Sequence, residues 1–374
     1  MHPEDQSASF PEPRPEVQRL RPAVHGGPDY AELCRLGLSP GDVLDFSAST
    51  NAYGPPPGVV EAMAMADVTR YPDRHAIALR EAIAEREGVS CAEVLVGNGA
   101  AQLIWLVAMA YLRPGDVAFV VGPTFGEYRV AAQLMGAHVV EWRADESSDF
   151  VPDLSALEVA LKESGPRLVW LCNPNNPTGV YLGAEAVARL HAAALGALWV
   201  IDEAYRPFVA DAWPSVHLIA KGGVVLLRSL TKDHALPGVR LGYALAAPSV
   251  IEALARVQPP WSVSAMAQAA GLVALQDRRH VAHTIGILRA EATALRDALR
   301  AQGWRVVPSA THFCLVEVGD ARIVRDRLLR EHRIQVRDCT SFGLPRFVRV
   351  AARRPEENER LLSAMEALRC RPGR

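Results

Sequence analysis

The segment Ser229-Leu230-Thr231-Lys232-Asp233-His234-Ala235-Leu236-Pro237-Gly238-Val239-Arg240-Leu241-Gly242-Tyr243 holds one lysine between small hydroxyl residues and an arginine. A lysine amine can bond covalently to an aldehyde, and hydroxyl and guanidinium groups donate hydrogen bonds to phosphate. Lys232 is therefore a candidate aldehyde anchor, and Ser229, Thr231 and Arg240 are candidate phosphate ligands. A lone lysine in such a segment is more often an exposed turn residue, so the interpretation depends on the rest of the chain.

Short apolar runs alternate with helix-length segments in the first two thirds of the chain. This alternation predicts βαβ crossovers and a mostly parallel sheet. The predicted strands are 94–96, 117–121, 138–142, 168–171, 198–201, 225–227 and 241–244. Polar or glycine-containing loops follow most of them, and ligands of open α/β sheets bind at the carboxyl ends of the strands.

The later part of the chain predicts a second, smaller unit. A mainly helical region over 249–301 is followed by strands near 305–307, 313–318 and 347–350 and by a closing helix over 355–368. We predict four parts: a flexible tail (1–22), the N-terminal part of a small domain (23–49), a large domain that holds the cofactor (50–260) and the C-terminal part of the small domain (261–374).

The composition is that of an ordinary globular protein, with 49% hydrophobic and 22% charged residues. The net charge of −2 gives no reason to expect nucleic acid or an anionic membrane as a partner. No targeting segment is visible, so we expect a cytoplasmic protein. The six cysteines lack paired spacing, which argues against a metal site and predicts reduced, buried thiols.

The lysine segment resembles that of the fold-type I pyridoxal 5′-phosphate (PLP) enzymes, the aminotransferase superfamily. The resemblance implies that Lys232 holds the cofactor as a Schiff base. Asp202-Glu203-Ala204-Tyr205 is similar to the superfamily's D-x-A-Y segment, which implies that Asp202 pairs with the ring nitrogen and that Tyr205 bonds the ring oxygen O3′. By itself, an aspartate at a strand end would more often be a helix cap.

Two loops extend the resemblance. Asn173-Pro174-Asn175-Asn176-Pro177-Thr178-Gly179 is similar to the superfamily's N-P-N-N-P-T-G loop, which implies that Asn176 also bonds O3′. Gly99, Ala100 and Ala101 lie where these enzymes bind the cofactor phosphate, and backbone N–H groups at a helix N-terminus suit that role. The implied fold is α/β: a PLP-transferase-like large domain with a mostly parallel, seven-stranded sheet, and a smaller α+β domain built from both termini.

Three further residues match by position. Phe125 resembles the aromatic residue that stacks on the cofactor ring, and Tyr71 resembles the tyrosine that reaches the cofactor phosphate of the neighbouring subunit, which implies a homodimer with shared active sites. Arg349 lies where these enzymes keep the arginine that binds the substrate carboxylate. Without the resemblance, the aromatics would be interpreted as core residues and Arg349 as an edge-strand residue.

Within the superfamily the chain is most similar to histidinol-phosphate aminotransferases and to threonine-phosphate decarboxylases of cobalamin synthesis. The segments around His25 and Arg337 imply contacts with a substrate phosphate, and the Asn51-Ala52-Tyr53-Gly54-Pro55 loop implies one from Tyr53. Ser49, a candidate substrate contact, stands where the decarboxylases have asparagine.

Two reactions therefore remain open. The first is transfer of an amino group from an L-amino acid or a phosphorylated amino compound to a 2-oxo acid. The alternative is decarboxylation of threonine O-3-phosphate. A PLP-sensing regulator is disfavoured, because the N-terminal segment has no room for a DNA-binding domain and no basic face.

Overall fold

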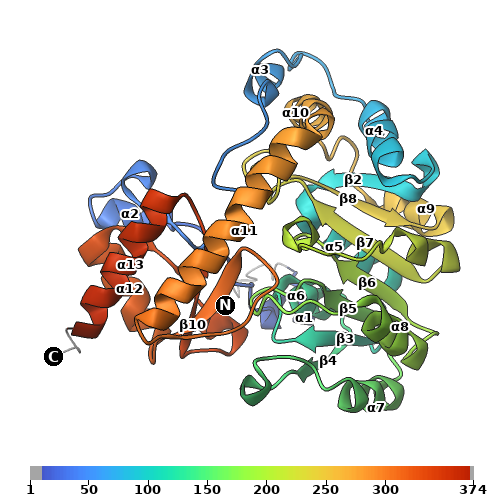
Figure 1. Ribbon diagram of the computed structural model, residues 1–374. Coiled ribbons are helices and arrows are strands. Elements are labelled where there is room, and N and C mark those ends of the chain that lie inside the picture. The colour runs from blue at the N-terminus through green and yellow to red at the C-terminus, as the bar shows by residue number, and fades with distance from the viewer. Residues whose placement is uncertain (1–10, 371–374) are drawn as a thin grey trace, which may run out of the picture.

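The computed structural model describes residues 11–370. A larger α/β domain and a smaller α+β domain lie side by side, and the long helix α11 (Arg278–Ala301) runs from one to the other (Figure 1). Residues 1–10 of the predicted tail and residues 371–374 of the predicted small domain lie outside the described residues.

The large domain is built on a seven-stranded sheet in the order β2-β8-β7-β6-β5-β3-β4. Only β8 is antiparallel to its neighbours in this sheet. The segment between β7 and β8 contains Lys232 and no helix, so the chain returns directly alongside β7. The strands are β2 (Val94–Asn98), β3 (Val117–Gly122), β4 (His138–Arg143), β5 (Leu168–Cys172), β6 (Leu198–Asp202), β7 (Val224–Ser229) and β8 (Leu241–Ala246).

Both faces of this sheet are covered, which explains why its central strands are continuous apolar runs. Trp199 belongs to the core on one face and Trp170 to the core on the other, and both are fully buried. The first face packs against α4 (Ile77–Glu87), α7 (Leu154–Ser164) and α8 (Ala184–Ala193). The second packs against α5 (Gly99–Tyr111), α6 (Glu127–Leu134) and α9 (Pro248–Val257).

The small domain joins both ends of the chain, as predicted. Its antiparallel sheet has the order β12-β13-β10-β9, and β1 (Leu44–Asp45) pairs in parallel with β11 (Ile334–Gln335). Figure 1 shows α2 beside the two C-terminal helices. The remaining elements are α2 (Tyr30–Arg35), β9 (Arg305–Val306), β10 (Phe313–Glu317), α12 (Ala321–His332), β12 (Arg337–Asp338), β13 (Phe347–Ala351) and α13 (Pro355–Cys370).

The boundary between the domains was predicted near residue 260. Helix α10 (Ala265–Gln276) packs against α3 (Val59–Ala64) and α4 of the large domain, whereas α11 contacts α13 and β9. We therefore place the passage between the domains within α11.

The segment predicted as a flexible tail contains a short helix, α1 (Pro15–Arg19), whose first residue is a proline, a residue that suits the first turn of a helix. One sequence-based expectation, that the cysteines are buried, does not hold throughout. Cys34 is exposed, whereas Cys172, Cys314 and Cys339 are buried as expected.

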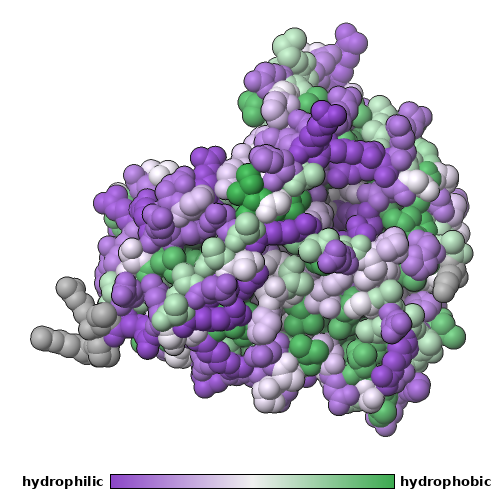
Figure 2. Space-filling model, in the orientation of Figure 1, coloured by the Kyte–Doolittle hydropathy of each residue, from purple (hydrophilic) through white to green (hydrophobic). Residues whose placement is uncertain are grey.

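No helix among residues 11–370 is both long and apolar enough to cross a membrane. On the face drawn in Figure 2, hydrophobic residues are scattered among hydrophilic ones.

Candidate active site

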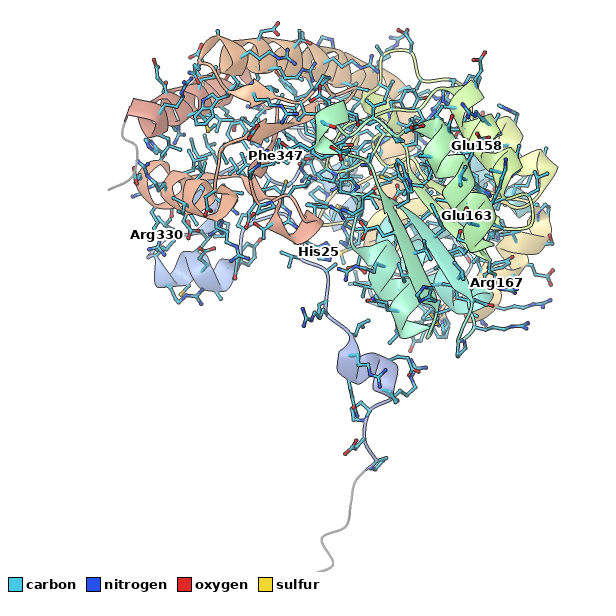
Figure 3. All side chains as sticks on the ribbon, turned by 90° about the horizontal axis from the view of Figure 1, so that it is seen from below. His25, Glu158, Glu163, Arg167, Arg330 and Phe347 are labelled. Carbon is cyan, nitrogen blue, oxygen red and sulfur yellow. The ribbon has the colours of Figure 1, made fainter. Side chains whose placement is uncertain are left out.

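A cavity of about 730 Å³ contains most of the predicted site residues. Its wall combines strand ends of the large domain, the segment around His25 and two arginines of the small domain. Figure 3 shows His25 where the N-terminal segment meets the boundary between the domains. The predicted residues that line the cavity are His25, Ala100, Ala101, Phe125, Asn176, Asp202, Tyr205, Ser229, Thr231, Lys232, Arg240, Arg337 and Arg349.

The parallel strands β5, β6 and β7 determine where the central groups lie. Cys172 is opposite Asp202, and Asp202 is opposite Leu227, so the three strands end at the same edge of the sheet. Lys232 follows the end of β7. Its Nζ lies 3.4 Å from the carbonyl oxygen of Ala48 and 5.7 Å from the centroid of the Tyr205 ring.

Asp202 is buried and hydrogen-bonded at both carboxylate oxygens. Oδ2 accepts from the Tyr128 hydroxyl at 2.7 Å, and Oδ1 accepts from the Ala204 backbone N–H at 2.9 Å. Burial raises the pKa of Asp202, and the hydrogen bond from Tyr128 opposes this. A buried carboxylate is costly without a cation, and a protonated ring nitrogen would supply one.

The sequence analysis missed Tyr128. A fully buried tyrosine at the start of a helix looks like a core residue, and its partner is far away in the sequence. Its ring stacks on Trp170 with centroids 5.0 Å apart and touches Phe125 edge-on at 5.7 Å. Tyr128 therefore holds both the carboxylate and the predicted stacking ring in place.

A small enclosure for a phosphate forms where β2 ends and β8 begins. Asn98 pairs with Leu241, which brings Arg240 beside Gly99. A Cβ added at Gly99 would lie 2.7 Å from Arg240 Nη2, the mobile end of that side chain, whereas the φ of +70° is the conformation that favours glycine here.

Two sets of donors complete this enclosure. Helix α5 begins at Gly99, so the N–H groups of Ala100 and Ala101 lack helical acceptors. Ser229 Oγ and Thr231 Oγ1 are 2.6 Å apart. Donors of this kind at a helix N-terminus suit a phosphate, and together with Lys232 and Asp202 they fit PLP.

Two buried arginines form the other side of the cavity. Arg337 and Arg349 are directly opposite each other on β12 and β13, and they are 6% and 4% exposed. Arg349 donates to Asn176 Oδ1 and to the Ser47 carbonyl, and its Nε has no hydrogen-bond partner among residues 11–370. Arg337 donates to the Val24 carbonyl and to Ser341 Oγ.

Neither guanidinium forms an ion pair with a carboxylate in the part of the chain that the structure describes. Burying a cation without a counter-ion is unfavourable. The pair of arginines is therefore suited to an anionic group of the substrate.

His25 does not contact these arginines directly. Its Nε2 lies 2.8 Å from Glu127 Oε1, and the other carboxylate oxygen accepts from Trp105 Nε1 at 3.0 Å. Neither Glu127 nor Trp105 was predicted as a site residue, because both lie far from His25 in the sequence and meet it only in the folded cavity wall.

Four predicted residues lie outside the cavity lining: Gly99, Ser49, Tyr53 and Tyr71. Gly99 contacts Arg240, as described. Ser49 is buried, and its hydroxyl has no hydrogen-bond partner in the described part of the chain. The Arg354 guanidinium lies over the Tyr53 ring at 5.6 Å. Tyr71 is 77% exposed and stacks on Trp261. The predicted contacts of Ser49, Tyr53 and Tyr71 remain predictions.

Comparison with known proteins agrees with this geometry. Residues 41–365 match the family model described as aminotransferase class I and II. The chain is 38% identical to a histidinol-phosphate aminotransferase from Symbiobacterium thermophilum, over 95% of this chain and 98% of that protein.

Two solved structures have the same fold. The histidinol-phosphate aminotransferase from Sinorhizobium meliloti in complex with PLP matches with a TM-score of 0.87 at 26% identity, covering 96% of this chain and 98% of that one. An L-threonine-O-3-phosphate decarboxylase from Porphyromonas gingivalis matches with a TM-score of 0.77 at 25% identity, covering 87% and 99%. The chain belongs to the aminotransferase class I and II family and is a PLP-dependent aminotransferase of fold type I.

Proposed function

We propose that the enzyme transfers the amino group of histidinol phosphate to a 2-oxo acid. The observation that carries the proposal is a pair of buried arginines in the cavity, Arg337 and Arg349, which have no carboxylate partner among residues 11–370. A phosphate dianion in a partly buried site requires several charge-assisted donors. Relatives at 33–38% identity over most of the chain are histidinol-phosphate aminotransferases, which supports amino transfer rather than the decarboxylase alternative.

Each central residue has a defined role in this proposal. When bound, PLP supplies a ring that accepts electrons from the bond that breaks at the substrate Cα. Asp202 would hold a positive charge at the ring nitrogen, and Asn176 and Tyr205 would donate to the ring oxygen. Lys232 would anchor the cofactor in the resting enzyme, and its amine would move the proton at the substrate Cα.

The reaction itself is tested by offering both substrates to the purified holoenzyme. With histidinol phosphate and 2-oxoglutarate we expect glutamate to form. With threonine phosphate we expect no release of CO2 above background. Rapid CO2 release without glutamate formation would instead support the decarboxylase reaction.

Arg337→Ala is expected to weaken binding of the phosphate selectively. Loss of one charged hydrogen-bond donor should weaken binding of histidinol phosphate, measured through KM, by about 1.5 to 3 kcal/mol. The loss for unphosphorylated histidinol should be much smaller. Steady-state kinetics with both substrates measure this difference. Arg322→Ala, which removes an exposed arginine of the same domain, serves as the control. Equal effects of Arg337→Ala on both substrates would mean that Arg337 does not bind the phosphate.

We also propose that the enzyme is a cytoplasmic homodimer in which Tyr71 reaches the partner's cofactor. The exposure of Tyr71 supports this proposal. Its apolar neighbours Met65 and Val68 are also exposed, by 85% and 70%, and so are available to a partner subunit. One chain has a mass of 40.6 kDa, and light scattering should give twice this value. A mass of one chain at micromolar concentration would contradict the shared site.

A further inference from the structure

Glu127 brings a carboxylate into the cavity, and no lysine or arginine of the described residues neutralises its charge. Its side chain is 11% exposed, and its two oxygens contact His25 Nε2 and Trp105 Nε1. The indole N–H is neutral, and the histidine is charged only when protonated. Within residues 11–370, no lysine or arginine forms an ion pair with Glu127.

The carboxylate is held firmly and keeps room for another donor. Glu127 is the first residue of α6, where the helix dipole favours a negative charge. The preceding Gly126 is close to Ala23, since a Cβ added there would lie 3.1 Å from the Ala23 Cβ. Two carboxylate oxygens offer about four acceptor positions. His25 and Trp105 use two of these, so acceptor positions remain for a ligand.

The N-terminal segment connects this carboxylate to the arginine pair. Arg337 donates to the carbonyl of Val24, and the next residue, His25, contacts Glu127. Arg337 and Glu127 line the same cavity, so a substrate whose anionic group binds at Arg337 can extend its neighbouring groups toward Glu127. A second anionic group would be repelled there, whereas an N–H donor would be stabilised.

We propose that Glu127 determines substrate specificity by accepting a hydrogen bond from a ring N–H on the side chain of the substrate. This inference rests on the proposed function, because histidinol phosphate carries an imidazole on the same carbon skeleton as its phosphate. An imidazole has at least one N–H in either protonation state. A carboxylate that loses this donor remains partly buried with an unused acceptor, so a substrate without the ring N–H is rejected.

The test compares two substrates in the E127Q holoenzyme. Histidinol phosphate and phenylalaninol phosphate share the amine and the phosphate, but the phenyl ring has no N–H. Glutamine keeps the size of Glu127 and one oxygen acceptor for the Trp105 indole. We expect kcat/KM for histidinol phosphate to fall roughly 10- to 100-fold, mainly through KM, the range for one hydrogen bond to a charged group. For phenylalaninol phosphate, kcat/KM should stay within about threefold or rise.

Two further variants separate this role from a structural one. Glu141→Gln removes a carboxylate of β4 that lies outside the cavity and pairs with Arg143. It should leave kcat/KM for both substrates unchanged. His25→Gln measures how loss of the histidine alone changes kcat/KM for each substrate. If E127Q and His25→Gln lower kcat/KM for both substrates by the same factor, Glu127 only positions His25 and the inference is overturned.

The outcomes also separate this inference from the proposed function. If the parent enzyme does not use histidinol phosphate, the proposed function is wrong and the inference goes with it. If the parent uses it and E127Q has the same preference between the two substrates as the parent, only the inference is overturned. Unchanged cofactor absorbance and melting temperature of E127Q exclude misfolding as the cause of a loss.

Discussion

Lys232→Ala is expected to lower the rate of amino transfer by at least about 10³-fold, or roughly 4 kcal/mol. The variant loses both the covalent anchor of the cofactor and the amine that moves the proton at the substrate Cα. It should also lose the visible absorbance that a PLP ring covalently bound to lysine gives. Glutamate formation from histidinol phosphate and 2-oxoglutarate measures the rate, and an absorbance spectrum measures the bound cofactor.

The control for this variant is simple because the chain contains only three lysines, Lys162, Lys221 and Lys232. Lys162 is exposed on α7, so Lys162→Ala should transfer amino groups at the parent rate and keep the absorbance. A Lys232→Ala enzyme with the parent rate would show that another group carries the chemistry.

Asp202→Asn is expected to lower kcat by two decades or more, about 3 kcal/mol. The amide has the shape of the carboxylate but not its charge, so the ring nitrogen would no longer be held in its protonated form. The fold should persist, because the Asn oxygen can still accept from the Ala204 backbone N–H and the amide nitrogen can donate to the hydroxyl oxygen of Tyr128. Stopped-flow or steady-state rates measure the loss, with Asp211→Asn on the exposed surface as the control.

Tyr128→Phe provides a graded comparison at the same carboxylate. It removes one hydrogen bond to Asp202 but keeps the ring that stacks on Trp170. We expect a decrease of roughly tenfold, smaller than that of Asp202→Asn. An unimpaired Asp202→Asn enzyme would mean that a different group faces the ring nitrogen.

The sequence was sufficient to predict the strands of the large sheet and the two-ended small domain. Buried parallel strands are continuous apolar runs whose polar ends are adjacent in the fold, and the resemblance of the segments at these ends to those of PLP enzymes predicted that Asn176, Asp202 and Lys232 share one site. The antiparallel direction of β8 was not predicted, since a strand's direction depends on the connection before it.

The interactions between distant segments could not be predicted in the same way. The register of β12 and β13 places Arg337 opposite Arg349, and no local pattern encodes that register. Tyr128 and Glu127 follow Phe125 in the sequence, yet their partners Asp202 and His25 lie far along the chain in opposite directions. Their side chains resemble a core residue and a helix-start residue until tertiary packing brings the partners together.

The most direct test of the central claim is to identify the lysine that holds the cofactor. The holoenzyme is reduced with borohydride, digested with trypsin and analysed by mass spectrometry. We expect the added pyridoxyl phosphate mass on the fragment 229–240, which lies between cleavage after Arg228 and cleavage after Arg240, because modified Lys232 is not cleaved. The added mass on a fragment that contains Lys162 or Lys221 instead, or on no fragment, would contradict the assignment of Lys232 and of the site built around it.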